Sequence, residues 1–369
     1  MARLRETVQR VTPAFFRSSG VVPGWPNLSP GIAVTQTAPH VRDAFSLERA
    51  MRSVLVALVP CIFMAFYNTG YQANVDVAIA GVKTAPGWRG ATLDMLAVGY
   101  ELSSVWAAIM HGALYFLPIL VVTVVVGGLW ERIFARLRNR PTAEGFMVIA
   151  ILFSLSLPRT IPLWQVALGI SFAIVVGKEI FGGTGRNFLN PVLTGLAFLY
   201  VTYPREMIGE TAWTVIDAFT EPTYLQLAAR KGPEVVTWLG TPWLTTFVGL
   251  SPGSIGTTST LACLVGATYL LYKRIASARI MAGVLFGMVA TVLWVNQFGD
   301  QANPFVGVSW HWHLTLGSFA FGAVFLATDP VSAAMTNTGR WIYGLLIGFM
   351  IVLIRVANTS HPDGVMFAI

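Results

Sequence analysis

The residues best suited to chemistry form a glycine-rich connection between two apolar segments, Phe181-Gly-Gly-Thr-Gly-Arg-Asn-Phe-Leu-Asn-Pro191. Its glycines let the backbone approach a ligand closely, and consecutive N–H groups can cradle an anion. Arg186, Asn187 and Asn190 add side-chain donors. The structural alternative is a tight hairpin whose asparagines cap helices. Because such polar residues are costly beside membrane helices unless they have partners, the pattern favours a ligand.

A second polar stretch, Ser251-Pro-Gly-Ser-Ile-Gly-Thr-Thr-Ser-Thr260, combines glycines with serine and threonine hydroxyls. Free N–H groups at the start of a helix attract a phosphate or an electron-rich ring. Ordinary N-capping and close packing of small residues explain the same composition. The composition of this stretch leaves both interpretations open.

Two carboxylates lie next to apolar segments and could bind an ion or a proton. Glu131 follows Gly127-Gly128-Leu129-Trp130, and Asp329 lies within Ala327-Thr-Asp-Pro-Val-Ser332. The structural alternative for Asp329 is a helix cap beside a proline. For Glu131 the alternative is a surface ion pair with Arg132.

The segment Trp310-His-Trp-His313 carries alternate histidines that could hold a metal, but no third ligand lies nearby in the sequence. Aromatic side chains at the level of the lipid headgroups are the commoner explanation, so we predict no metal site. The sequence also has no Walker, HExxH, nucleophile-elbow or dinucleotide motif. Their absence argues against hydrolytic chemistry and against nicotinamide binding within this chain.

The amino-acid composition indicates the class of protein that carries these motifs. The 369 residues are 55% hydrophobic and only 11% charged, whereas soluble domains carry about 25% charged residues. This excludes a disordered chain and an ordinary soluble enzyme, and predicts a polytopic membrane protein. The net charge of +7 then marks cytoplasmic loops and no nucleic-acid partner is expected. Cys61 and Cys263 lie in apolar runs and are interpreted as packing residues.

Apolar runs define the candidate spans, since a crossing helix needs about 20 apolar residues. The long candidates are 53–69, 104–130, 280–298 and 341–356, and the shorter ones are 146–157, 163–177, 188–203, 235–250, 261–272 and 312–327. Several are too short to cross the bilayer alone. Short or interrupted segments are tolerated only where protein covers their backbone, so we expect broken helices around an interior site.

Positive charge predicts the topology. Residues 1–52 are basic and lack a signal-peptide core, so the N-terminus should be cytoplasmic. The arginines of 132–140 would then also be cytoplasmic. If 235–250 crossed the membrane, Lys273 and Arg274 would lie outside, so we interpret 235–250 as interfacial and begin the next crossing near Ser254.

The predicted fold is an all-α polytopic membrane bundle of about ten helices, of which nine are visible, in two inverted five-helix repeats with broken helices. The regions are a basic cytoplasmic segment (1–52), a first transmembrane repeat (53–203), a periplasmic loop (204–253) and a second repeat (254–369). The second repeat is expected to lack its last helix. No residue-by-residue repeat is detected.

These motifs, in this order, resemble the family that contains the B-subunit of the sodium-translocating NADH:quinone oxidoreductase and, more distantly, the D-subunit of the Rnf electron-transport complex. The resemblance also includes His40-Val-Arg-Asp43 and Pro252-Gly-Ser-Ile-Gly256, and it covers nearly the whole chain. The long region before residue 53 is similar to the sodium-pump subunit.

The resemblance implies an FMN joined by a phosphoester to a threonine in the loop 204–253. The matching stretch is Asp217-Ala-Phe-Thr-Glu-Pro-Thr223, which makes Thr223 the acceptor and Asp217 and Thr220 parts of the attachment motif. Ala218, Glu221 and Pro222 depart from the family pattern. Without the resemblance, this stretch is interpreted as a helix-starting turn.

The resemblance also implies a noncovalent riboflavin, a quinone region and a sodium pathway. The matching positions are Arg186, Asn187 and Asn190 for riboflavin, Gly127, Gly128 and Trp130 for the quinone region, and Glu131 and Asp329 for sodium. Thr257 stands where the family commonly has glutamate.

The function implied is that of a flavoprotein subunit of a redox-driven sodium pump in the bacterial inner membrane. Electrons would pass from the FMN of a partner subunit through covalent FMN and riboflavin to ubiquinone, coupled to Na⁺ export. Such cofactors are needed because amino acids lack a suitable redox group. The implied partners are the other members of a six-subunit complex, including FMN-bearing, iron–sulfur and NADH/FAD subunits, and a flavin transferase. The alternatives are the corresponding subunit of an Rnf-type complex and a non-redox channel of the urea or ammonium type.

Overall fold

Among the residues that the structure describes, four helices are long and apolar enough to cross a bilayer, and they confirm the four long predicted spans. They are α2 (Leu47–Ile79), α4 (Val105–Leu137), α13 (Ala278–Phe298) and α16 (Asn337–Ala357). α2 and α4 have 33 residues each, or about 50 Å at 1.5 Å per residue. Because the hydrocarbon core is about 30 Å thick, the ends of both helices extend beyond it.

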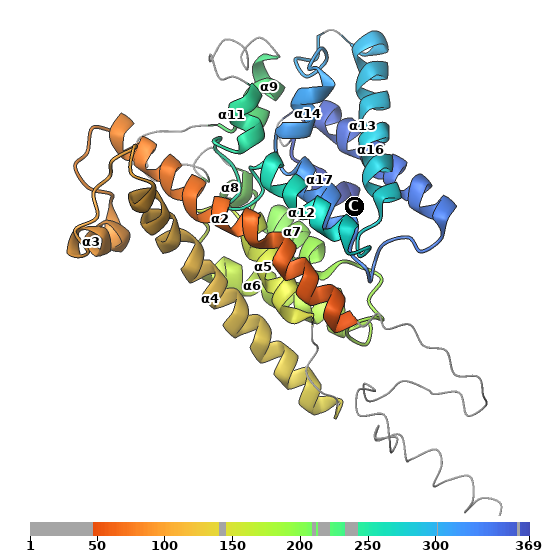
Figure 1. The fold of residues 1–369 in the computed structure, drawn as a ribbon, viewed down its shortest axis with the longest axis horizontal. Helices are drawn as coiled ribbons and strands as arrows, with labels where there is room; N and C mark the ends of the chain where they lie inside the picture. Colours follow the sequence, from red (N-terminus) through yellow and green to blue (C-terminus); the bar gives the residue numbers. More distant parts are fainter. Residues whose placement is uncertain are drawn as a thin grey trace, which may run out of the picture. The chain divides into compact units, whose positions relative to one another are not determined.

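The computed structural model describes residues 47–139, 145–208, 212, 222–232, 243–300, 302–359 and 362–369, all within the unit Ser46–Ile369 (Figure 1). These residues form helices and loops without a β-strand. The chain is therefore an all-α polytopic membrane protein. Asp217, Thr220 and most of the predicted segment 1–52 lie outside the described residues.

The remaining apolar helices are short or interrupted, as the sequence predicts. They are α5 (Phe146–Ser156), α6 (Leu163–Ile174) with the π-helical turn η1 (Val175–Glu179), α7 (Pro191–Thr202), α12 (Thr260–Tyr272), α14 (Trp310–Thr315), α15 (Phe319–Phe321) and the π-helical turn η3 (Gly322–Leu326). The connecting helices are α3 (Gly87–Met95), α8 (Pro204–Ile208), α9 (Tyr224–Lys231), α11 (Trp243–Val248) and α17 (Val365–Ala368). Neighbouring helices cover the interrupted backbone, which is the condition for breaks at membrane depth.

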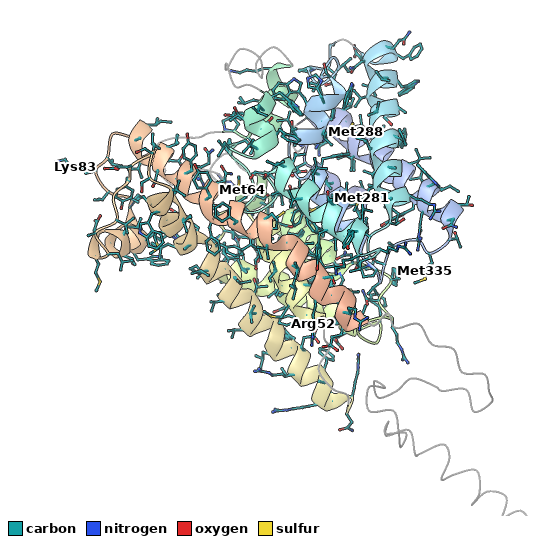
Figure 2. All side chains as sticks on the ribbon, in the orientation of Figure 1. Arg52, Met64, Lys83, Met281, Met288 and Met335 are labelled. Carbon is teal, nitrogen blue, oxygen red and sulfur yellow. The ribbon has the colours of Figure 1, made fainter. Side chains whose placement is uncertain are left out.

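Glycines set the closest helix crossings. α2 and α4 lie side by side (Figure 1), and a Cβ at Gly70 would overlap the carbonyl oxygen of Ala108. A Cβ at Gly112 would in turn overlap the carbonyl oxygen of Phe66. Close backbone approach through small residues is how membrane helices gain packing energy without a hydrophobic driving force between them. Figure 2 labels Arg52, near the start of α2, and Lys83, in the connection that follows its end.

α13 and α16 pack through two glycine pairs at four-residue spacing, Gly283 with Gly287 and Gly344 with Gly348. A Cβ at Gly344 would lie 2.6 Å from the carbonyl oxygen of Ile280, and one at Gly348 would overlap that of Val284. The two helices therefore form a reciprocal small-residue interface.

The interrupted helix α14–α15–η3 lies between two apolar clusters. Phe321, Val324 and Phe325 pack with residues of α2, α5 and α12, whereas Phe319 and Ala323 pack with α13 and α16. This short segment therefore connects the apolar cluster of α2, α5 and α12 with that of α13 and α16.

The structure changes two predicted boundaries. The crossing expected to begin near Ser254 begins at Thr260, because Ser259 caps α12 by accepting a hydrogen bond from Ala262 N and residues 251–259 are not helical. Of the segment 235–250, the described part contains only α11. The inverted-repeat arrangement stays a prediction.

Replacing Gly348 with alanine should destabilise the protein by about 1–3 kcal/mol, because the added methyl group overpacks the α13–α16 interface. The matched control is Gly128→Ala in α4, where a Cβ would meet the Phe146 ring at an ordinary 3.6 Å. The midpoint temperature at which detergent-solubilised protein loses its monodisperse elution peak measures the effect. A wild-type midpoint for Gly348→Ala would contradict the interface.

Candidate functional site

Thr223, the predicted flavin acceptor, is the N-cap of α9 and forms a capping box. Gln226 N donates to Thr223 Oγ1 at 3.3 Å, and Thr223 N donates to Gln226 Oε1 at 2.9 Å. Gln226 Nε2 also donates to the carbonyl oxygen of Ile208 at 2.7 Å, which ties the cap to α8. The cap uses an oxygen lone pair of Thr223 and leaves its hydroxyl proton outside the cap.

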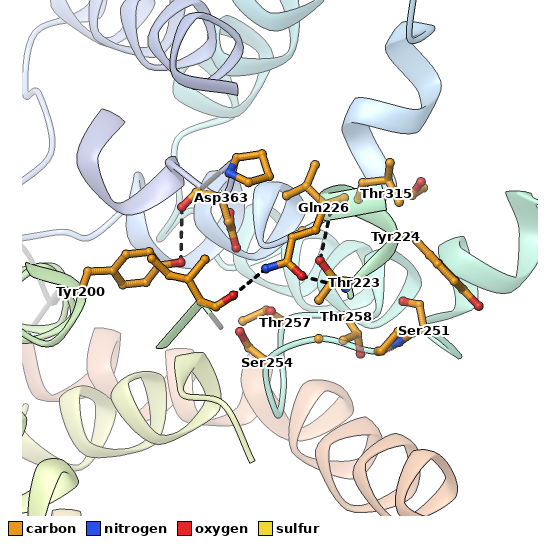
Figure 3. A pocket seen from close by; sticks show the side chains of 17 residues that line it. Tyr200, Thr223, Tyr224, Gln226, Ser251, Ser254, Thr257, Thr258, Thr315 and Asp363 are labelled. Carbon is orange, nitrogen blue, oxygen red and sulfur yellow. Dashed lines mark hydrogen bonds between the residues drawn. The ribbon is translucent and has the colours of Figure 1, made fainter. Parts of the chain in front are cut away.

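Thr223 lines a small pocket (Figure 3). The pocket joins segments that are far apart in the sequence, among them the start of α9, the loop 251–258 and the break after α14. Its polar lining residues are Tyr200, Thr223, Tyr224, Gln226, Ser251, Ser254, Thr257, Thr258, Thr315 and Asp363. The hydroxyl-rich loop, whose role the sequence left open, therefore faces the predicted attachment residue.

The break beside this pocket is held by two charged side chains. Gly317 has a φ of +72°, which a Cβ would strain, and it separates α14 from α15. Arg355 of α16 is fully buried and donates to the carbonyl oxygens of His313 at 2.9 Å and Leu316 at 2.7 Å. Asp363 accepts from Ser318 Oγ at 2.8 Å. The freed backbone groups of the break are thus partnered within the protein.

Glu131, a predicted sodium-pathway residue, forms a buried ion pair with Lys178 of η1. The prediction that Glu131 pairs with Arg132 is therefore wrong. Helix packing turns Glu131 towards α6 and η1, where the two side chains are 6% and 1% exposed. A second pair follows, in which Arg138 Nη1 donates to Glu179 Oε2 at 2.7 Å.

The predicted riboflavin residues occupy the turn between η1 and α7. Asn190 caps α7 by accepting from Val192 N at 2.9 Å, which is the structural alternative noted from the sequence. Asn187 Nδ2 donates to the carbonyl oxygen of Leu189, whereas Asn187 Oδ1 and Thr184 Oγ1 are buried without a hydrogen-bond partner among the described residues. Arg186 is exposed. The turn therefore presents unused acceptors, which supports a polar ligand.

The predicted quinone region lies on α4 against α5 and α6. Gly127 and Gly128 face the Phe146 ring, and a Cβ at Gly127 would lie 2.7 Å from that ring. Trp130 Nε1 donates to Ser171 Oγ at 2.9 Å. Gly127 and Glu131 are four residues apart on α4 and both buried, so part of this region and the Glu131–Lys178 pair lie on the same face of that helix.

Asp329, the other predicted sodium-pathway residue, lies in the turn between η3 and α16. Its Oδ2 accepts from Ser332 Oγ at 2.7 Å and from Ser332 N at 3.2 Å. Burial raises the pKa of the Asp329 carboxyl, and the donors of Ser332 oppose that shift. Asp329 also lines a small, mostly apolar pocket between α2, α5 and α12.

The sequence predicts that the aromatic side chains of 310–313 lie at the level of the lipid headgroups, and the structure agrees only in part. Trp310 is exposed, but Trp312 and His313 are buried, so the prediction is wrong for those two residues. His313 packs against Phe305 with ring centroids 5.1 Å apart and lies beside Arg355.

The two cysteines are free, as expected, although the sequence did not indicate that they meet. Cys61 of α2 and Cys263 of α12 are both buried, with their sulfur atoms 3.9 Å apart. They belong to the apolar cluster between these helices.

Sequence reasoning missed the buried polar residues Arg355, Asp76 and Arg159. Arg355 had a detectable signal, because it is a charged residue in an apolar run long enough to cross the membrane. Asp76 lay beyond the predicted span 53–69, and Arg159 lay in a predicted connection. α2 extends to Ile79 and so includes Asp76, and Arg159 is buried in its ion pair with Asp76.

Comparison with known proteins identifies the family. Residues 34–369 match the NQR2, RnfD, RnfE family. The chain belongs to this family. Among its relatives, the Na(+)-translocating NADH-quinone reductase B-subunit of Ectopseudomonas mendocina is 51% identical, over 91% of this chain and 84% of the relative.

Two further NQR2, RnfD, RnfE family members agree with that match. The proteins of the same name from Stutzerimonas stutzeri and Chromohalobacter salexigens are each 50% identical over 91% of this chain. They cover 84% and 82% of those relatives. The resemblance predicted from the motifs is confirmed.

Removing either partner of the Glu131–Lys178 pair should destabilise the protein by about 3–5 kcal/mol, because an uncompensated charge is left buried. Glu131→Gln and Lys178→Met should each show this loss, and the double variant should lose less than the two single losses combined. Unfolding by sodium dodecyl sulfate in mixed micelles measures the free energies.

The matched control is Glu179→Gln, which breaks the neighbouring pair and leaves the charge of Arg138, whose side chain is 30% exposed. Its loss should be smaller, because water can solvate the remaining charge. Strictly additive losses at Glu131 and Lys178 would contradict the predicted coupling.

Proposed function

We propose that this chain is the B-subunit of a sodium-translocating NADH:quinone oxidoreductase, which passes electrons through bound flavins to ubiquinone and couples this to Na⁺ export. The relatives at 50–51% identity carry the name of that subunit. The observation that carries the finer proposal is that Thr223 lines a pocket to which several serine and threonine side chains also contribute.

The surroundings of Thr223 fit a covalently attached FMN. The backbone N–H groups at the start of α9 provide a favourable setting for the phosphate of a phosphoester. The loop 251–258 offers hydroxyls, and Gly253 keeps its backbone accessible from the pocket. When bound, the flavin would supply one- and two-electron redox chemistry. Thr223 would anchor it, and Gln226 would hold Thr223 in place.

A noncovalent riboflavin fits the turn between η1 and α7. The unpartnered acceptors Asn187 Oδ1 and Thr184 Oγ1 could accept hydrogen bonds from ribityl hydroxyls or ring N–H groups. Arg186 would lie at the exposed edge, and Asn190 would contribute through the helix that it caps. Gly127, Gly128 and Trp130 would form the nearby quinone region.

Na⁺ transport is assigned to buried carboxylates, with Glu131 and Asp329 on the pathway. Each is held in the structure by a neighbouring donor, Lys178 or Ser332. A cation would have to compete with that donor for the carboxylate. Cation binding would therefore depend on whether the donor has moved away.

The proposed setting is the bacterial inner membrane, with residues 1–52 cytoplasmic and residues 204–253 periplasmic. The partners would be the other subunits of the complex, including FMN-bearing, iron–sulfur and NADH/FAD subunits, and a flavin transferase that modifies Thr223. The relatives' name favours this assignment over an Rnf-type subunit and over a non-redox channel.

Thr223→Ala should abolish the fluorescent flavin band of this subunit on a denaturing gel, because the variant lacks the hydroxyl that forms the phosphoester. Thr223→Ser should retain the band at reduced intensity. Thr257→Ala, which removes another hydroxyl of the pocket, is the matched control and should keep it. A band that persists in Thr223→Ala would place the attachment elsewhere.

A further inference from the structure

α2 carries a buried polar stripe, which we define as Asn68, Gln72 and Asp76. Their four-residue spacing places them on one face of the helix. The three residues are 3%, 8% and 6% exposed. Gln72 Nε2 donates to Asn68 Oδ1 at 3.4 Å. Three such residues on the buried face of a membrane helix are costly, and they indicate a polar route or site.

One end of the polar stripe reaches the pocket of Thr223. Asn68 Nδ2 donates to the carbonyl oxygen of Ser251 at 3.0 Å and to Thr258 Oγ1 at 3.2 Å. Ser251 and Thr258 both line that pocket, as Figure 3 shows. The stripe and the pocket are therefore continuous.

The other end of the polar stripe is closed by an ion pair. Arg159 Nη2 donates to Asp76 Oδ2 at 2.7 Å, and each side chain is 5% exposed. Arg159 lies in the turn between α5 and α6 and also reaches the carbonyl oxygen of Thr69 at 3.5 Å. The guanidinium neutralises the carboxylate while the pair is closed.

Unused hydrogen-bonding atoms lie next to this end. His111 Nδ1 and Asn74 Oδ1 are 2.7 Å apart, and Asn74 Nδ2 and His111 Nε2 have no hydrogen-bond partner among the described residues. The hydroxyl of Tyr100 is also buried and has no hydrogen-bond partner among the described residues. The ring centroids of Tyr100 and His111 are 5.7 Å apart. Buried polar atoms of this kind normally hold ordered water.

We propose that the polar stripe is a segment of the Na⁺ pathway through this subunit, with the Asp76–Arg159 pair as its gate. The inference rests on the proposed function. Na⁺ is a hard cation that binds carbonyl, carboxylate and water oxygens, and the stripe with its adjoining water positions offers all three. An arriving Na⁺ competes with Arg159 for Asp76, so the gate opens only when the ion pair separates.

The test uses the whole complex in inverted membrane vesicles, with NADH-driven uptake of ²²Na⁺ as the readout. Asp76→Asn should lower the initial uptake at least tenfold, because the carboxylate that receives the ion is lost. Gln72→Leu, which leaves the ion pair intact, should lower it at least threefold. Asp94→Asn, in the exposed part of α3, is the matched control and should stay within twofold of wild type.

The intensity of the covalent flavin band on a denaturing gel shows whether a variant assembles normally, so it distinguishes a transport defect from an assembly defect. The inference expects the band to keep wild-type intensity in Asp76→Asn and Gln72→Leu while uptake falls. Uptake within twofold of wild type in Asp76→Asn overturns the inference. A parallel loss of flavin band and uptake in both variants also overturns it, because that result indicates a structural role. If Asp76→Asn alone fails to assemble, Gln72→Leu decides the outcome. Absence of uptake or flavin in the wild-type complex would instead contradict the proposed function.

Discussion

The structure depends on satisfying backbone hydrogen bonds where helices break inside an apolar environment. The clearest case is the interruption at Gly317, where Arg355 donates to the carbonyl oxygens of His313 and Leu316. A helix end buried without such partners would cost several kcal/mol per exposed group. Arg355 therefore makes a non-helical backbone possible at this depth, and the break makes room for the pocket beside Thr223.

The two halves of the bundle are organised around that break. The interrupted segment packs one face into the cluster of α2, α5 and α12 and the other into that of α13 and α16. Glycine crossings bring the long helices close enough for their backbones to touch, at Gly70 with α4 and at Gly348 with α13. Close packing at these crossings makes the interior rigid, so polar groups within it keep fixed partners.

Those fixed partners fall into separate sites that a redox-driven pump can use. The pocket of Thr223 gathers hydroxyls and helix N–H groups, which suit an anionic flavin phosphate. Glu131 with Lys178, and Asp76 with Arg159, each hold a carboxylate next to a tethered cation. A buried carboxylate without such a partner would be unstable. The proposed transport requires that the carboxylate exchange this partner for a mobile cation. The pairing of each carboxylate with a cationic side chain therefore contributes to stability and also to the transport proposed here.

The sequence by itself determined the membrane location and the four long spans, because these depend on hydrophobic runs. It offered the helix-capping roles of Thr223 and Asn190 only as alternatives to ligand roles. It also indicated the family through its motifs. Only the tertiary structure decided that Glu131 pairs with Lys178 and not with Arg132, that Asn68 reaches Ser251, and that Trp312 and His313 are buried. These contacts join residues far apart in the chain, and the angle and rotation of packed helices select them, which local spacing does not encode.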